Sequence, residues 1–241
     1  MDHATGAPRL AYARLGTQVL QADVGWISRI FYRSPISLGE EAPARGGIPV
    51  LLPQFADRGT LPKHGFARAT HWVLTQESRS DQAHSLAFEL AVAPGQFADW
   101  PHACHLALRA RARQDSLRIS LEVTNTGNDD FAWTGGLHPY FSVDDVLYDA
   151  CPPLTLFTGA QSLTLTATGF EQWIGWNPGQ EGGDALPDLP VGDLRRFVCV
   201  EPVCVTRPAK LVPGAVFNGA LAISARGKKQ LNEGRVDASS F

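Results

Sequence analysis

The stretch Leu117-Arg-Ile-Ser-Leu-Glu-Val-Thr-Asn125 carries the clearest structural signal in this chain. Within it, polar residues alternate with the apolar residues Leu117, Ile119, Leu121 and Val123. Successive side chains of a β-strand point to opposite faces of its sheet, so this alternation predicts a strand with one face buried.

The same period of two recurs through the rest of the chain. The further alternating residues are Leu86, Phe88, Leu90 and Val92, then Leu106 and Leu108, then Leu163 and Leu165. Turn signals such as Pro94-Gly95 and Pro213-Gly214 separate these runs, and no long segment has the helical period. We therefore predict an all-β fold, a large antiparallel β-sandwich or a barrel-like stack of sheets. Large sandwiches often reach this length as one unit, so we expect residues 1–241 to form a single domain.

Composition excludes several classes of partner. The net charge of -3 provides no basic field for nucleic acid or an anionic membrane. No apolar stretch approaches the roughly 18 residues of a membrane span, and no signal peptide follows Met1, so we expect a cytoplasmic protein. The four cysteines lack the close spacing of zinc or redox sites, and buried free thiols are the expectation. These cysteines are Cys104, Cys151, Cys199 and Cys204.

Basic residues gather in an irregular stretch between Arg45 and Arg68. Its glycines and prolines predict a fixed loop of the kind that holds binding residues on β scaffolds. Arg45, Lys63 and Arg68 could converge on an anion, or they could be solvated surface charges. His64 alone is more typical of a structural histidine. A second stretch, from Gly182 to Asp193, is rich in glycine, proline and aspartate and predicts a surface loop.

Two further residues are candidates for proton transfer. His138 follows a strand-like segment within Gly135-Gly-Leu-His-Pro-Tyr-Phe141, and histidine is the usual general acid or base, although a structural role is also open. Glu201 is the only charged residue in the apolar run Phe197–Val205. A buried carboxylate costs several kcal/mol unless it is paired or neutralised, so function explains Glu201 best. Burial should also raise its pKa towards the range of a general base.

Other kinds of chemistry lack their usual signals. His102 and His105 are three residues apart, so on a probable strand they would face opposite sides, and the histidines do not predict a zinc site. A Gly-x-Ser-x-Gly elbow and a glycine-rich phosphate loop before a helix are both missing from the sequence. We therefore expect no metal.

Several short fragments, taken in order, resemble the hexose-6-phosphate mutarotases, also called glucose-6-phosphate 1-epimerases. The fragments are Arg45-Gly-Gly-Ile-Pro49, Leu61-Pro-Lys-His-Gly-Phe-Ala-Arg68, Leu137-His-Pro-Tyr-Phe141, Trp176-Asn-Pro178 and Cys199-Val-Glu201. The resemblance runs from about Gly16 to Ile223. It implies the galactose-mutarotase-like supersandwich, with a sugar site on a concave face. It also implies a reaction without a cofactor on a small sugar phosphate.

The resemblance also assigns roles to residues. His138 and Glu201 match the family's catalytic pair, Arg45, Lys63 and Arg68 match substrate-binding positions, and His64 would line the same pocket. The family usually has glutamine where this chain has Lys63, so a neutral contact would here become a charged one.

The chain departs from that family between His138 and Trp176, where the family has a longer segment that includes an aspartate contacting the sugar. Asp144, Asp145 and Asp149 lie nearby, but none can be matched to it. Either the protein lacks the segment after about residue 146, or residues are missing from the sequence. We favour the second interpretation, because losing whole strands would expose sheet edges.

The resulting hypothesis is acid/base exchange of sugar anomers. Glu201 takes the proton of the anomeric hydroxyl while His138, as imidazolium, protonates the ring oxygen. One alternative is an aldose 1-epimerase acting on unphosphorylated sugars, and another is a carbohydrate-binding protein without catalysis. We expect a monomer or weak homodimer.

Overall fold

The computed structural model describes residues 6–13, 15–16, 19–24, 29–40, 42–143, 155–158 and 161–227, and these form an almost entirely β structure. The first seven strands are β1 (Arg9–Tyr12), β2 (Val19–Asp23), β3 (Val50–Leu51), β4 (Val73–Arg79), β5 (Ala83–Val92), β6 (Cys104–Arg113) and β7 (Ser116–Asn125). The remaining strands are β8 (Phe131–Leu137), β9 (Tyr140–Ser142), β10 (Thr155–Thr158), β11 (Gln161–Thr168), β12 (Gln172–Trp176), β13 (Phe197–Leu211) and β14 (Val216–Gly227). The short helices are η1 (Ala67–Ala69), α1 (Gly179–Asp184) and η2 (Asp193–Arg196).

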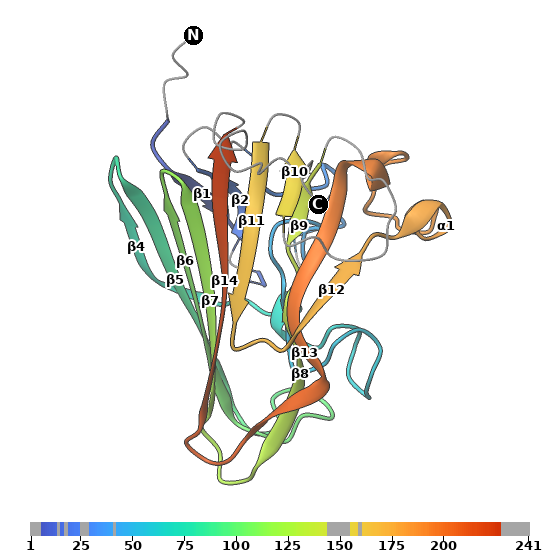
Figure 1. Cartoon of the computed structure of the whole chain (residues 1–241). Coiled ribbons are helices and arrows are strands. Elements are labelled where there is room, and N and C mark those ends of the chain that lie inside the picture. Colours follow the sequence, from blue (N-terminus) through green and yellow to red (C-terminus); the bar gives the residue numbers. More distant parts are fainter. Residues whose placement is uncertain are drawn as a thin grey trace, which may run out of the picture.

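Two large antiparallel sheets face each other across the core (Figure 1). The larger sheet has the strand order β10-β11-β14-β7-β6-β5-β4. The smaller sheet runs β12-β13-β8-β3, with β9 pairing along β13, and β1 and β2 form a separate ribbon. The predicted all-β antiparallel sandwich is therefore confirmed. The single domain spanning residues 1–241 stays a prediction.

The alternating stretch that opened the sequence forms β7, near the centre of the larger sheet. Leu117, Ile119, Leu121 and Val123 are all buried in the main core, while the polar residues between them are exposed or half-buried. The neighbouring strand β6, and β5 beyond it in the same sheet, bury their alternating residues in the same way. Burying this continuous apolar layer between the sheets is the main force that holds the sandwich together.

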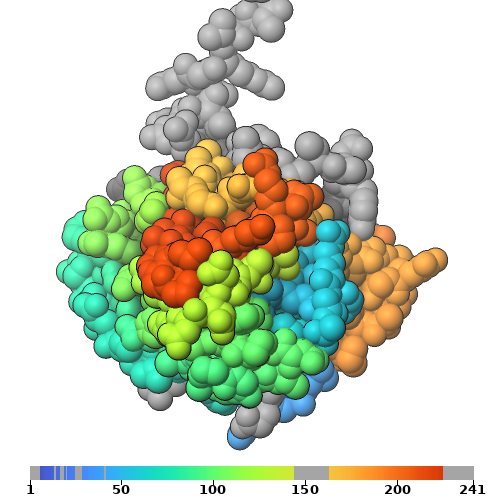
Figure 2. Space-filling view, turned by 90° about the horizontal axis from the view of Figure 1, so that it is seen from below, coloured from blue at the N-terminus to red at the C-terminus, as the bar shows by residue number. Residues whose placement is uncertain are grey.

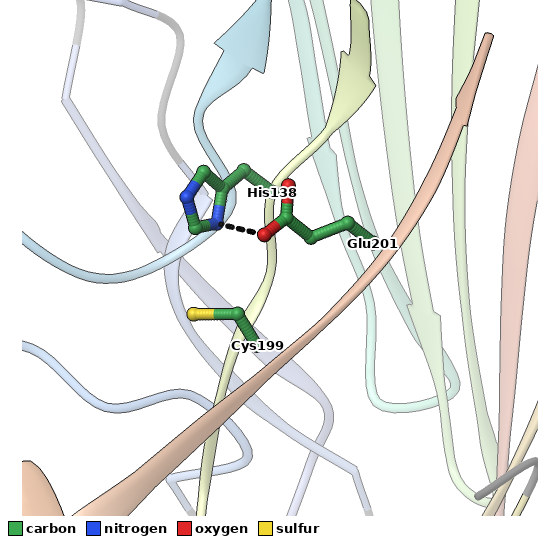
Figure 3. Close-up of side chains that lie close together, drawn as sticks. All are labelled: His138, Cys199 and Glu201. Carbon is green, nitrogen blue, oxygen red and sulfur yellow. Dashed lines mark ion pairs between the residues drawn. The ribbon is translucent and has the colours of Figure 1, made fainter. Parts of the chain in front are cut away.

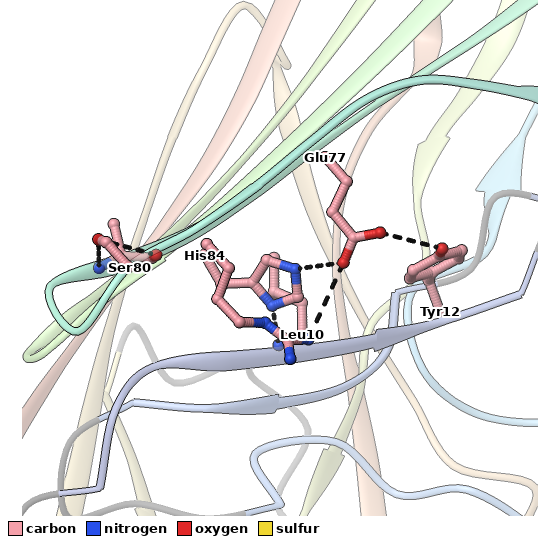
Figure 4. A network of polar contacts seen from close by, with 7 residues as sticks. Leu10, Tyr12, Glu77, Ser80 and His84 are labelled. Atoms are coloured by element: carbon pink, nitrogen blue, oxygen red, sulfur yellow. Dashed lines mark hydrogen bonds and ion pairs between the residues drawn. The ribbon is translucent and has the colours of Figure 1, made fainter.

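The N-terminal ribbon is tied to the larger sheet by polar contacts around His84 (Figure 4). His84 is fully buried, and its Nδ1 accepts a hydrogen bond of 2.9 Å from the Leu10 amide. Its Nε2 lies 3.0 Å from Oε1 of Glu77, and the Tyr12 hydroxyl lies 3.3 Å from Oε2 of Glu77. The buried imidazole therefore has a partner at each nitrogen, which satisfies the requirement for burying a polar side chain.

The stretch from Gly182 to Asp193 was predicted to be a surface loop, and this was partly wrong. It overlaps the ends of α1 and η2, and the buried residues Leu189 and Leu194 anchor it. These leucines pack in a cluster with Tyr32 and Phe197. The apolar residues, rather than any helical periodicity, hold this segment against the smaller sheet.

The interpretation that residues are missing between His138 and Trp176 stays a prediction. Within this interval, β10 and β11 form a hairpin, and β11 pairs with β14 from Gln161 to Thr168. This short hairpin covers the edge of β14 that a loss of strands would have exposed. Asp144, Asp145 and Asp149 lie outside the described residues.

One end of the sandwich is closed by hairpin connections (Figure 2). The connection between β13 and β14 is held there by hydrogen bonds from the Asn125 amide to the Ala215 carbonyl and from the Gly214 amide to the Asn125 carbonyl.

Cys104, Cys199 and Cys204 are free and buried, as predicted, and Cys151 lies outside the described residues. None of the helices in the described ranges has the length and apolar character needed to cross a membrane.

The strand β8 passes unusually close to its two neighbours at Gly135 and Gly136. Both glycines have positive φ angles, 140° and 151°. A Cβ atom at Gly135 would collide with the backbone carbonyl of Leu51 in β3, and one at Gly136 would collide with that of Pro202 in β13. Glycine is required here by both conformation and space, and β8 continues directly to His138.

We expect Gly135→Ala to destabilise the protein by more than about 3 kcal/mol, because it adds a backbone collision to an unfavourable φ angle. Gly192→Ala is the matched control, since Gly192 also has a positive φ, 86°, but open space around it. The free energy of unfolding of the control variant should fall by only about 1–2 kcal/mol. Urea denaturation measures the stability of both variants. Equal losses of stability would contradict the role given to the close approach of β8 to β3.

Candidate active site

His138 is positioned by the end of β8 and by hydrogen bonds to the loop before β3. Its amide donates to the Pro49 carbonyl at 2.9 Å, and the amide of Tyr140 donates to Gly47 at 2.9 Å. The imidazole ring stacks on the ring of Tyr140, with centroids 4.7 Å apart and planes within 8°. The side chain is thus held in one orientation by backbone and ring contacts.

Glu201 lies within β13, which pairs with β12 on one side and with β8 and β9 on the other. Its side chain is almost completely buried, as the apolar run around it predicted. Oε1 of Glu201 lies 3.4 Å from Nδ1 of His138 (Figure 3). Nδ1 of His138 and Oε2 of Glu201 have no hydrogen-bond partner among the described residues, although both atoms are buried. Buried polar atoms without partners are rare in proteins and indicate a functional role here.

Burial shifts the proton affinities of this pair in opposite directions. It raises the pKa of Glu201 to about 8, which confirms the predicted direction. It lowers the pKa of His138 well below its usual value, and the positive charges of nearby side chains add to that effect. In the empty pocket, a proton shared by the pair therefore resides on Glu201 rather than on His138.

A cavity of about 280 Å³ lies against this pair. It is lined by Arg45, Phe55, Ala56, Lys63, His64, Arg68, His138, Tyr140, Ile174, Trp176, Leu186 and Glu201. All of the residues predicted to form the site therefore meet at one cavity. Their catalytic and binding roles remain predictions.

Arg45 is held in the cavity wall by a residue that sequence reasoning missed. Its Nε donates to Oδ1 of Asp188 at 2.8 Å, and its Nη1 lies 3.3 Å from the hydroxyl of Tyr140. Asp188 is buried, so this ion pair is shielded from water. Asp188 comes from the segment predicted to be a surface loop, and nothing in its local sequence distinguishes it from the other aspartates there.

The other basic residues differ in their exposure. Arg68 is half-buried, and no carboxylate among the described side chains forms an ion pair with it. Lys63 is exposed at the rim, and its Nζ lies 3.6 Å from Oδ2 of Asp57. Arg68 is therefore better placed than Lys63 to hold an anion inside the cavity.

His64 is buried and adopts a positive φ of 69°. Its Nδ1 accepts a hydrogen bond from the Ala56 amide at 3.3 Å. Burial, with the charges of Arg68 and Lys63, lowers the pKa of His64 to about 4. The neutral ring must then carry its proton on Nε2, which makes this nitrogen a hydrogen-bond donor.

Trp176 completes the pocket from the end of β12. Its ring meets the imidazole of His138 edge-on, with centroids 5.8 Å apart and planes at 88°. The side chain is about one-third exposed, at 36%. The sequence indicates Trp176 only as part of the fragment Trp176-Asn-Pro178. Its position in the cavity wall comes from the structure.

The cavity combines a buried pair that can exchange a proton with hydrogen-bond donors and positive charge around it. Such a site suits transfer of protons to and from hydroxyl groups of a small polar molecule that also carries negative charge. Cys199 lies beside the pair, on the same strand as Glu201. The potential metal-ligand atoms of His138, Cys199 and Glu201 lie within 4.8 Å of one another.

Comparisons with known proteins agree with this chemistry. Residues 40–150 match the family model described as aldose 1-epimerase. A protein of Cenchrus ciliaris with the provisional name glucose-6-phosphate 1-epimerase is 26% identical over 230 residues, which cover 75% of this chain and 70% of that protein. A Salmonella typhimurium protein with the same provisional name is 27% identical over 245 residues, which cover 84% of this chain and 79% of that protein.

A solved structure supports the fold as well. The crystal structure of a provisionally named mutarotase from Salmonella typhimurium matches this fold with a TM-score of 0.78 and 24% sequence identity. The match covers 92% of this chain and 88% of that protein's chain. The resemblance indicated by the short sequence fragments is confirmed by these comparisons.

The pKa of Glu201 predicts how stability depends on pH. A carboxyl group whose pKa is raised on folding, from 4.5 to about 8, stabilises the native state at low pH. That contribution is lost as the pH rises through about 8. Above the usual histidine value of 6.5, His138 is neutral in both the folded and unfolded states, so the window from 6.5 to about 8 isolates Glu201.

We therefore expect the free energy of unfolding to fall with rising pH in this window, and Glu201→Gln to flatten the slope. Urea denaturation at several pH values measures it. Glu181→Gln, which alters an exposed carboxylate on α1, should leave the slope unchanged. A slope that survives in Glu201→Gln would show that another group titrates in this range.

Proposed function

We propose that this relative of the aldose 1-epimerases is a hexose-6-phosphate mutarotase, which interconverts the α and β anomers of glucose 6-phosphate or a similar aldohexose 6-phosphate. The observation that carries the proposal is the buried pair of His138 and Glu201, 3.4 Å apart, against a cavity lined by Arg45 and Arg68. The names of the relatives support the same reaction. We place the reaction in the cytoplasm and expect a monomer or weak homodimer.

In the proposed reaction, the pair acts on two oxygens of the sugar ring. Glu201 accepts the proton of the anomeric hydroxyl while His138 protonates the ring oxygen, and the bond between C1 and the ring oxygen breaks. Rotation about the C1–C2 bond turns the other face of the aldehyde towards the oxygen. The two residues then exchange roles and close the ring to the opposite anomer. Protons are only exchanged, so no cofactor is required.

The protonation state of the empty pocket differs from the state that begins this reaction. Burial favours a protonated Glu201 and a neutral His138, whereas ring opening by this route needs the carboxylate and the imidazolium. The two states contain the same number of protons, and the ion pair gains Coulomb attraction at short distance. A bound phosphate raises the pKa of both groups, so it favours the reactive state only where it lies closer to His138 than to Glu201.

The cavity wall supplies the contacts for such a substrate. Arg68 offers a guanidinium without a carboxylate partner among the described residues, and Arg45 is held in a fixed orientation by Asp188. Guanidinium groups bind phosphate through paired hydrogen bonds. His64 and Trp176 also line the cavity, and we infer that the Nε2 proton of His64 and the ring of Trp176 contact the sugar itself.

One observation favours an alternative substrate. Asp188 already neutralises part of the charge of Arg45, which weakens the attraction of that residue for phosphate. An aldose 1-epimerase acting on unphosphorylated sugars would use the same acid/base pair, and Arg45 would then bind hydroxyl groups. The two candidates differ in how activity depends on the basic residues.

Replacing the acid/base pair should remove catalysis while leaving binding. We expect Glu201→Gln to lower kcat for anomer exchange of glucose 6-phosphate by about 10²- to 10⁴-fold with little change in KM. Exchange spectroscopy by NMR measures this above the spontaneous rate. Glu171→Gln alters an exposed carboxylate and should retain full activity. Near-normal turnover in Glu201→Gln would refute the assigned role.

Removing charge from the cavity separates the two substrate classes. We expect Arg68→Gln to lower kcat/KM for glucose 6-phosphate by roughly 10- to 150-fold, because a hydrogen bond to a charged group contributes about 1.5–3 kcal/mol. The kcat/KM for unphosphorylated glucose should change little. Lys63→Gln, at the exposed rim, should have a smaller effect. Equal losses for both sugars would favour the unphosphorylated substrate, and Arg45→Ala tests the same point at the other arginine of the cavity.

A further inference from the structure

We propose that His138, Cys199 and Glu201 form a binding site for Zn²⁺, and that zinc bound there blocks the cavity. The potential ligand atoms of these residues all lie within 4.8 Å of one another, and the side chains are buried. The spacing of histidines and cysteines along the chain does not detect ligands that come from separate strands.

The spacing of the atoms fits zinc with small movements. Two ligands of a tetrahedral zinc ion, each about 2.0–2.3 Å from the metal, lie roughly 3.3–3.8 Å apart. Nδ1 of His138 and Oε1 of Glu201 are 3.4 Å apart. Cys199 precedes Glu201 by two residues in β13, so both side chains point to the same face of the sheet. Figure 3 shows the Cys199 thiol on the same side of the strand as the imidazole and carboxylate.

The unsatisfied atoms of this cluster support a ligand independently of the spacing. Nδ1 of His138 and Oε2 of Glu201 are buried without a hydrogen-bond partner among the described residues. A metal ion would satisfy the imidazole nitrogen and the carboxylate together, which the protein does not do by itself. Imidazole, thiolate and carboxylate are also the ligand types that zinc accepts, whereas magnesium and calcium prefer oxygen alone.

The charges of the site would balance. Zinc displaces the proton of the Cys199 thiol and any proton on the Glu201 carboxyl, and both protons pass to solvent. The thiolate and carboxylate then neutralise the two positive charges of the ion. A neutral cluster avoids adding charge beside Arg45 and Arg68, which makes the burial of the ion feasible.

The cavity provides the remaining coordination position. His138 and Glu201 line it, while Cys199 is not among the lining residues. A water molecule or hydroxyl group from the cavity side can therefore be the fourth ligand. Zinc at this point would occupy both groups of the proposed acid/base pair, so it would inhibit rather than assist the proposed reaction.

Cobalt(II) replaces zinc in such sites and reports a thiolate ligand by a charge-transfer absorption band in the near ultraviolet. We expect Co²⁺ added to the metal-free protein to produce this band at one equivalent, and Zn²⁺ to abolish it. Cys199→Ser should lose the band and weaken Zn²⁺ binding, measured by calorimetry, by more than the roughly 10- to 100-fold effect of an outer-shell change. Cys204→Ser is the matched control, because Cys204 is also buried in β13 but is not in the cluster.

The absorption and calorimetric measurements contain no sugar, so they test the zinc site whether or not the proposed function is correct. Absence of the band, or equal binding by the wild type and Cys199→Ser, would overturn the proposal. In the activity assay, which rests on the proposed function, Zn²⁺ should inhibit the wild type and Cys204→Ser at much lower concentration than it inhibits Cys199→Ser. Zinc that bound through Cys199 without inhibiting would refute the blocking role.

Discussion

The close approach of β8 to β3 and β13 is the constraint on which the site depends. At Gly135 and Gly136 the backbone passes so near to its neighbours that a side chain has no room. This contact sets the depth at which β8 ends, and therefore where His138 enters the space beside Glu201. The glycines have no chemical role in the pocket, but they let β8 run close enough to its neighbours to bring His138 beside Glu201.

Burial then gives the pair its chemical character. The same removal of water raises the pKa of Glu201 and lowers that of His138, which reverses their usual order, so that a shared proton resides on Glu201. The surrounding charges are not uniform, because Asp188 offsets Arg45 while Arg68 has no such partner among the described residues. The cavity is therefore suited to an anion at one side and to neutral hydroxyl groups near the pair.

The stacked aromatic wall and the buried cysteine give the site two further properties. Tyr140 and Trp176 contact the imidazole of His138 and restrict its orientation. Cys199 adds a soft ligand behind the same pair. Buried polar atoms that lack a hydrogen-bond partner among the described residues are open to a metal ion of suitable ligand preference.

The sequence by itself determined the sandwich, because strands with one buried face must alternate, as β7 does from Leu117 to Val123. It also indicated Glu201, since one charge in an apolar run is costly without a purpose. Only the tertiary structure decided that Asp188 holds Arg45 and that β10 and β11 cover the edge of β14. Those contacts join segments far apart in the chain, and local patterns contain no information about which distant side chain fills a given space.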